Sequence, residues 1–399
     1  MDMEKLRRDG EAMQSWLIEL RRDLHRCPEM GFELPLTRAR VKRELEAMGC
    51  VPVDCGKAGI VALIGGKKPG RTFLLRGDMD ALPMQEEADV EFLSEIPGQM
   101  HACGHDLHTS MLLGAAKLLK EREGDIPGTV KLMFQPAEEN FQGAEDMVRA
   151  GVLKNPDVDA AMMIHVLSGQ AMPVGMFLVP TGGVSTASCQ LYHITVRGKG
   201  GHGSTPHLTV DPITAAAHIH LALQEINSRE LDPHGYGVFT TCKFRAGETV
   251  NVIPETAEMW GTVRTMDPEG KVGDYIKTRM TEIAQGVGAA LRCEVDVVFG
   301  DYCPCVVVDE ALSTCTRGYL EDLFGPMVEP VAQWGGGSED FSYVSLQVPA
   351  VTMFMGAGDA EHGYDQGLHN PKVRFDESAL WRGSVAYAGV ALRWLEENA

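Results

Sequence analysis

The feature that most restricts the fold is a regular alternation of two kinds of segment in the first part of the chain. Short runs of aliphatic and β-branched residues indicate strands, and they alternate with amphipathic segments that indicate helices. Strands separated by helices form mostly parallel sheets that helices cover on both faces. The expected strands are 59–64, 72–76, 128–134 and 159–164, and the expected helices are 11–26, 37–47, 106–119 and 142–149.

The middle of the chain has a different rhythm. Its order of strand, helix, strand, strand, helix and strand is typical of a ferredoxin-like α+β unit. Its expected elements are 190–196, 212–228, 236–245, 256–265, 268–290 and 292–299, and the first rhythm then resumes with 309–322, 349–355 and 377–397. We therefore expect an α/β catalytic domain made of residues 1–185 and 301–399, with a smaller domain, 186–300, inserted between them.

Charge and hydropathy limit the possible partners. The 399 residues include 36 basic and 56 acidic ones, a net charge of −20, so neither nucleic acid nor an anionic membrane is an expected partner. No apolar stretch approaches the ~18 residues of a membrane span, and the mixed charges of residues 1–10 do not resemble a signal peptide. The ten cysteines form no paired framework and are expected to be reduced. These features favour a cytoplasmic protein that binds a small molecule.

The densest group of chemically active residues lies between His101 and Thr109. Three histidines, a cysteine and an aspartate occur there within eight residues, at the junction of a loop and a helix. A thiolate at Cys103 and an imidazole at His105 can converge on one cation. So many ligand types in one loop are hard to explain by structure alone, and we expect a metal site.

Two acidic pairs follow expected strands. Asp78 and Asp80 follow the second strand, as metal ligands or as residues that orient a ligand. Glu138 and Glu139 follow the third strand, so one carboxylate could bind metal while the other acts as general base.

The expected strands give way to loops at Gly77, Gln135 and His165. Because ligands of open α/β sheets bind beyond the carboxyl ends of strands, we expect these three points to form one site. His165 and His369 complete the possible ligands, although either histidine alone would most often be structural.

A glycine-rich segment, Gly198–Gly203, fits the pattern that binds dinucleotides. However, Pro206 stands where the helix of that motif should already be running, and the segment falls outside the parallel sheet. A nucleotide site is therefore disfavoured.

Taken in order, the motifs resemble those of the di-metal amidohydrolases that cleave N-acyl amino acids: aminoacylases, hippurate hydrolases and auxin-conjugate hydrolases. These enzymes are relatives of metal-dependent aminopeptidases and carboxypeptidases. The resemblance extends over nearly the whole chain, through Leu24–Glu29, Gly77–Pro83, His101–Thr109, Gln135–Glu139, Gly198–His202, Asn251–Pro254, Gly261–Thr265, Ser338–Phe341 and His369–Pro371.

The resemblance implies a metal-dependent exopeptidase-like fold with two divalent ions in each subunit. It implies that Glu138 is the general base, and that the metal ligands are Cys103, His105, Glu139, His165 and His369. Broader relatives have a histidine where Asp78 stands, which leaves open which ligand bridges the two metals.

The resemblance also implies that the middle domain is a lid and a dimerisation module of a homodimer. His202 would reach the active site of the neighbouring subunit and stabilise the oxyanion. Asn251 and Arg264 would hold the carboxylate of the substrate, or Arg264 would instead brace the lid.

The expected reaction is hydrolysis of an N-acyl amino acid to a carboxylic acid and a free amino acid, with two metals activating water and Glu138 as base. Zinc and manganese are favoured, and cobalt and nickel are compatible with the ligands. The alternatives are a dipeptidase or aminopeptidase, a dinucleotide-dependent oxidoreductase, and a non-catalytic binding protein of the same fold.

Overall fold

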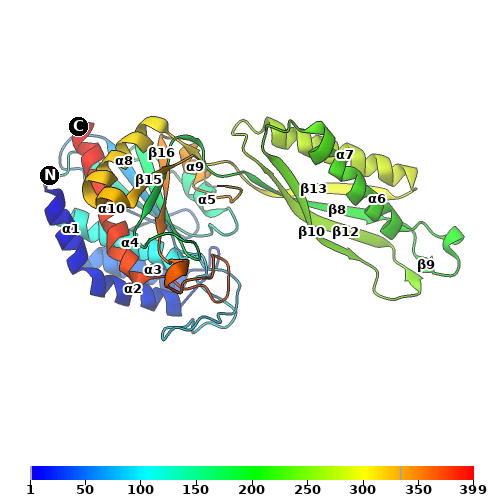
Figure 1. Ribbon diagram of the computed structural model, residues 1–399, viewed down its shortest axis with the longest axis horizontal. Coiled ribbons are helices and arrows are strands. Elements are labelled where there is room, and N and C mark those ends of the chain that lie inside the picture. The colour runs from blue at the N-terminus through cyan, green and yellow to red at the C-terminus, as the bar shows by residue number, and fades with distance from the viewer. Residues whose placement is uncertain (1, 333–334) are drawn as a thin grey trace. The chain divides into compact units, whose positions relative to one another are not determined.

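A computed structural model describes residues 2–332 and 335–399 (Figure 1). It divides into two compact units. The larger unit contains the residues up to Ser185, the segment that begins at Val307, and Asp340–Ala399; the smaller unit contains Thr186–Val306 and Gly335–Glu339.

An eight-stranded sheet runs through the larger unit, in the order β1-β2-β4-β3-β5-β16-β6-β15. The neighbours β4/β3, β3/β5, β5/β16 and β6/β15 are parallel, and the other three pairs are antiparallel. The predicted mixed, mostly parallel sheet is therefore confirmed. The strands are β1 (Val53–Cys55), β2 (Gly59–Gly65), β3 (Thr72–Asp78), β4 (Thr129–Gln135), β5 (Ala160–Leu167), β6 (Phe177–Pro180), β15 (Val328–Val331) and β16 (Ala350–Gly356).

Helices cover this sheet. The most buried is α4, whose side chains are almost all enclosed because it contacts β3, α2 and α10, and it lies beside α10 in Figure 1. The helices of this unit are α1 (Met3–Ala12), α2 (Gln14–Arg26), α3 (Pro35–Ala47), α4 (His105–Lys120), α5 (Gly143–Arg149), α8 (Glu310–Phe324), α9 (Ser342–Ser345) and α10 (Leu380–Glu397).

Two features of the larger unit differ from the predictions. The first predicted helix, 11–26, is α2, and a further helix, α1, precedes it; the charged residues of α1 face outward while Leu6 is fully buried. The short strands β1, β6 and β15 were not predicted, because three or four residues are too few to display a period of two. The same holds for the paired strands β7 (Gly183–Val184) and β14 (Val307–Val308).

The smaller unit has a four-stranded antiparallel sheet, in the order β10-β12-β8-β13. Helices α6 and α7 lie together against this sheet (Figure 1), and the core between them includes Ile194, Ile219, Met259 and Ile276. Element order and strand order are both those of a ferredoxin-like unit. The elements are β8 (Cys189–Arg197), α6 (Pro212–Glu225), β10 (Gly237–Ala246), β12 (Thr256–Thr265), α7 (Lys271–Ala290) and β13 (Glu294–Cys303).

A second, two-stranded sheet of the smaller unit pairs β9 (Gly201–His202) with β11 (Val252–Ile253). In the part of the chain that the structure describes, no helix is both long and apolar enough to span a membrane. All ten cysteines are free thiols.

Candidate metal centre

The candidate site lies where the central parallel strands end. Asp78, the last residue of β3, pairs in register with Gln135, the last residue of β4. The neighbouring strand β5 carries His165. The strand continues to Leu167, so His165 lies within β5 and not, as predicted, at its end. Since parallel strands end at one edge of a sheet, three sequence-distant segments meet here.

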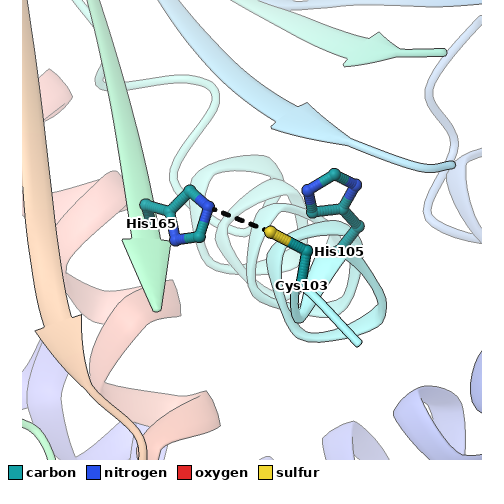
Figure 2. A group of neighbouring side chains, drawn as sticks. All are labelled: Cys103, His105 and His165. Carbon is teal, nitrogen blue, oxygen red and sulfur yellow. Dashed lines mark hydrogen bonds between the residues drawn. The ribbon is translucent and has the colours of Figure 1, made fainter. Parts of the chain in front are cut away.

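The loop before α4 brings Cys103 and His105 to the same edge. Gly104 separates them with a φ of +89°, and a Cβ atom at this position would come within 2.4 Å of the Val166 side chain. Only glycine satisfies both conditions. Figure 2 shows the three side chains of Cys103, His105 and His165 close together, with His165 Nε2 3.5 Å from Cys103 Sγ.

Two further predicted ligands, Glu139 and His369, also belong to a group with Cys103. His369 Nε2 is 3.3 Å from Cys103 Sγ and 3.6 Å from Glu139 Oε2. Glu139 in turn places Oε1 3.9 Å from His105 Nε2. The structure therefore brings all five predicted ligands into one group, although the sequence spreads them from residue 103 to residue 369.

The hydrogen bonds of the histidines direct free ring nitrogens into this group. His105 Nδ1 donates to the Asp80 carbonyl (2.8 Å), and His165 Nδ1 donates to the Val166 carbonyl (2.8 Å). Their Nε2 atoms consequently face the thiol and the carboxylates. His105 Nε2 and Glu139 Oε1 are buried and have no hydrogen-bond partner among the described residues. Thiolate, imidazole and carboxylate donors with such unpartnered atoms fit divalent transition metals.

The electrostatics of the group point to the same ligand class. Burial, reinforced by Asp80 and Asp78, raises the pKa of Glu139 to about 7. Burial and the charge of Glu139 raise the pKa of the Cys103 thiol well above its usual value. Burial lowers the pKa of His165, which keeps its imidazole neutral. A bound cation would favour the deprotonated thiol and carboxylate that metal binding requires.

Asp80 holds the two glutamates in place. Its Oδ1 and Oδ2 atoms accept the backbone N–H groups of Glu138 (3.0 Å) and Glu139 (3.2 Å). The turn before the pair is sharp, since Ala137 has a φ of +55°, which few residues other than glycine adopt. Glu138 is 6% exposed, and its Oε2 lies 3.9 Å from His105 Nε2.

Asp78 belongs to a buried network that the sequence analysis did not identify. Its Oδ2 accepts from Arg76 (2.5 Å) and its Oδ1 from His108 (2.6 Å). Arg76 also donates to Gln135 (2.8 Å) and to Asp340 (3.0 Å). The signal that could have found this network is Arg76 itself, a charged residue inside an otherwise apolar strand, because buried charges require partners.

The three site residues predicted in the smaller unit are placed differently. His202 and Asn251 are brought together by the β9/β11 pairing, in which His202 is opposite Val252, and both are exposed. His202 Nδ1 contacts Ser204 Oγ (2.8 Å). Arg264 donates to the Gly336 carbonyl (3.0 Å) and to Ser338 Oγ (2.9 Å), so its guanidinium holds this segment in place.

The glycine-rich segment does not have the dinucleotide-binding arrangement. After Arg197 the chain enters the two-residue strand β9 and a short 3-10 turn, Pro206–Leu208, before α6 begins. A Cβ atom on Gly198 would lie 2.2 Å from the Val210 carbonyl oxygen, so packing accounts for this glycine. The oxidoreductase alternative loses its basis.

Similar proteins are known. Residues 74–393 match the model of peptidase family M20/M25/M40. Thermostable carboxypeptidase 2 of Saccharolobus solfataricus is 37% identical, with 99% of each chain covered. IAA-amino acid hydrolase ILR1-like 4 of Arabidopsis thaliana is 37% identical over 96% of this chain and 86% of its own, and N-acetylcysteine deacetylase of Bacillus subtilis is 35% identical over 97% and 98%.

A solved structure has the same fold. It is a Bacillus subtilis protein described as a dinuclear metal binding peptidase from the M20 family. Its TM-score is 0.79 at 33% identity, covering 97% of this chain and 99% of that one. The family model matches residues 74–393 and the carboxypeptidase relative aligns over almost the full length, so this chain belongs to peptidase family M20/M25/M40.

Proposed function

We propose that the protein hydrolyses the amide bond of N-acyl amino acids, releasing a carboxylic acid and a free amino acid. The observation that carries the proposal is the group of thiol, imidazole and carboxylate donors around Cys103, in which Cys103 and His105 are buried. Two relatives support the substrate class, because their names describe an acetylated amino acid and an IAA-amino acid as substrates.

The five predicted ligands would hold two divalent ions, and Cys103 is common to two groups of these donors. Cys103 belongs to one group of donors with His105 and His165 and to another with Glu139 and His369. The ligand atoms of each group lie within 4.8 Å of one another. Zinc or manganese is the proposed metal, and cobalt and nickel also suit these donors.

Such ions supply a Lewis acid for the carbonyl and lower the pKa of a bound water toward neutrality. In our proposal Glu138 would accept the proton of the attacking water and deliver it to the leaving amine. Asp80 fixes the backbone of Glu138, so the carboxylate is held beside the donor group before substrate binds. Asp78 and Asp80 act by orienting these groups.

We assign to the smaller unit, predicted as domain 186–300, the roles of lid and dimerisation module. The partner subunit's His202 would stabilise the developing oxyanion, and Asn251 would bind the substrate carboxylate. Arg264 would act indirectly, by holding residues 336–338.

A homodimer is supported by the surface of this unit. Strand β10 is at the edge of its sheet and ten residues long, and Val238 and Phe244 on it are 39% and 44% exposed. Long edge strands with exposed apolar side chains are suited to pairing with a second copy.

A panel of substrates tests the proposal. The enzyme is freed of metal with a chelator, reloaded with zinc, manganese, cobalt or nickel, and given N-acetyl and N-benzoyl amino acids, their carboxamide derivatives, and dipeptides. Products are separated by chromatography. We expect metal-dependent cleavage of the N-acyl amino acids and slow cleavage of the carboxamides, which lack the carboxylate.

The second candidate is a peptidase, which the carboxypeptidase relative favours. Faster cleavage of dipeptides than of any N-acyl amino acid would replace our proposal with this one. Cleavage that is unaffected by the chelator would refute both.

A further inference from the structure

We propose that His108 is a positioning residue of the metal centre, which orients His165 through the backbone of Val166. The inference rests on the proposed function, since it assigns to His165 the role of metal ligand. It concerns a residue with no previous role, fully buried on the first turns of α4.

Both ring nitrogens of His108 have partners. Its Nδ1 lies 2.6 Å from Asp78 Oδ1, and its Nε2 lies 2.9 Å from the backbone nitrogen of Val166. The Val166 N–H can only donate, so Nε2 must carry the lone pair and Nδ1 the hydrogen. The surroundings therefore select one neutral tautomer of His108.

The peptide groups of Val166 join His108 to His165. His108 Nε2 accepts the N–H of Val166, and the C=O of the same residue accepts Nδ1–H of His165. The two imidazoles pack edge to face, with ring centroids 4.8 Å apart. The Nδ1 atom of His165 is thus bonded to Val166, whose backbone His108 fixes. The Nε2 atom of His165 faces Cys103, at 3.5 Å from its Sγ atom.

These contacts exclude a role for His108 as a ligand. Asp78, His105 and His108 do form a group whose spacing could hold a cation. However, both nitrogens of His108 are engaged, and the Asp78 oxygens accept from His108 and Arg76. A cation bound to His108 would have to break one of the two buried hydrogen bonds of its ring, which is costly.

The other end of the network gives His108 a rigid base. Arg76, which holds Asp78, also donates to Asp340, and Asp340 accepts the backbone N–H of Ala144 (2.9 Å). Arg76 and Asp340 are almost fully buried. Arg76 on β3, itself held by Asp340, therefore fixes the carboxylate of Asp78. Asp78 in turn holds the imidazole of His108 where its Nε2 atom accepts the N–H of Val166 on β5.

Two substitutions separate the contacts of His108. In His108→Gln the side-chain carbonyl can reach the position of Nε2 and accept from Val166, but the donor to Asp78 is lost. In His108→Asn the amide can replace Nδ1–H and donate to Asp78, but the acceptor for Val166 is lost. Both remove the same buried ring, so each is the control for the other.

The readout is metal content of the full-length protein, equilibrated with graded concentrations of zinc in a competing chelator. Thermal unfolding of the metal-free variants reports general damage. We expect His108→Gln to bind both ions nearly as the unaltered protein does. We expect His108→Asn to bind one ion normally and the other about 10–100-fold more weakly, the usual effect of losing a partner that orients a ligand.

Cobalt substitution adds a spectroscopic signature. The charge-transfer absorption of a cobalt–thiolate bond should persist in His108→Asn, because Cys103 still binds the remaining ion. Excess metal should restore hydrolysis to this variant.

Equal metal binding by both variants and the unaltered protein would overturn the inference. So would an equal loss in both variants, or a loss confined to His108→Gln, since either would place the effect on the Asp78 contact or on general packing. If the unaltered protein itself binds no metal, the proposed function fails before any variant is compared.

Discussion

The candidate metal centre and the β9/β11 strand pair that carries His202 differ in burial and in the contacts of their histidines. In the candidate metal centre Cys103 and His105 are buried, and His105 donates to the carbonyl of Asp80, 25 residues away. His165 donates to the carbonyl of its neighbour Val166, whose N–H is accepted by His108, 58 residues away. On strand β9 His202 is exposed, and its Nδ1 atom contacts Ser204 Oγ, two residues away. The comparison teaches that contacts between segments far apart in the sequence orient the predicted ligands, whereas the exposed His202 is oriented by a local contact.

The largest expected effect in the candidate metal centre is that of removing the proposed general base, Glu138. Glu138→Gln should reduce kcat by ~10²–10⁴, because the amide cannot accept the proton of water. Metal content should stay at the level of the unaltered protein, since the ligands are intact. Steady-state kinetics and elemental analysis measure the two quantities.

Glu145→Gln on α5 is the matched control, because this half-exposed carboxylate pairs with Arg149 outside the donor group. It should leave kcat unchanged. Near-normal turnover in Glu138→Gln, or an equal loss in both variants, would contradict the role of Glu138.

A somewhat smaller effect is expected from the substitution of His202 on strand β9. His202→Ala should lower kcat by ~10²–10³, the usual effect of removing one oxyanion donor. Exposed His207 in the same loop is the control, and His207→Ala should be nearly neutral.

Mixing subunits tests whether His202 acts across the dimer. Inactive Glu138→Gln and His202→Ala subunits should regain about a quarter of full activity when randomly reassociated, because one of the two sites in each heterodimer is then complete. No recovery, with heterodimers demonstrated by a tag, would place His202 in its own subunit's site.

The smallest effect concerns His101, a histidine of the metal-binding loop that is not in the donor group. It is 1% exposed, and neither ring nitrogen has a hydrogen-bond partner among the described residues. Burial lowers the pKa of His101 to about 3, from a usual value of 6.5. Between these pH values the unfolded chain binds a proton that the folded chain does not, so the free energy of unfolding falls as the pH falls.

His101→Leu should therefore weaken the acid dependence by up to ~1.4 kcal/mol per pH unit below pH 6.5. Urea unfolding of metal-free protein between pH 4 and 7 measures this slope. Exposed His234→Leu is the control and should preserve the slope of the unaltered protein. An unchanged slope in His101→Leu would show that the pKa of His101 is not lowered in the folded protein.

Much of the fold follows from the sequence, because alternating periodicities specify the strands β3, β4 and β5 and the helices between them. The same reasoning places Asp78 and Glu138 at one edge of the sheet, since each follows a parallel strand. Motifs that are local in sequence are thus readily found.

The network behind the ligands was not predicted, since its partners are far apart in sequence. Asp340 is 264 residues from Arg76, and no pattern in either segment indicates that the two side chains are in contact. Likewise His108 resembles any histidine on a helix until the fold brings Val166 to its Nε2. The ligand roles of His165 and His369 were implied by resemblance, and they remain predictions that the geometry supports.

The central claim is that the two groups of donors that overlap at Cys103 would hold two metal ions. Elemental analysis of the unaltered protein and of Cys103→Ala, each reloaded with metal and freed of excess, tests it most directly. We predict two ions per chain in the unaltered protein and a severe loss of both in the variant, because the shared thiolate contacts both groups of donors. One ion in the unaltered protein, or loss of only one ion in Cys103→Ala, would contradict the shared site.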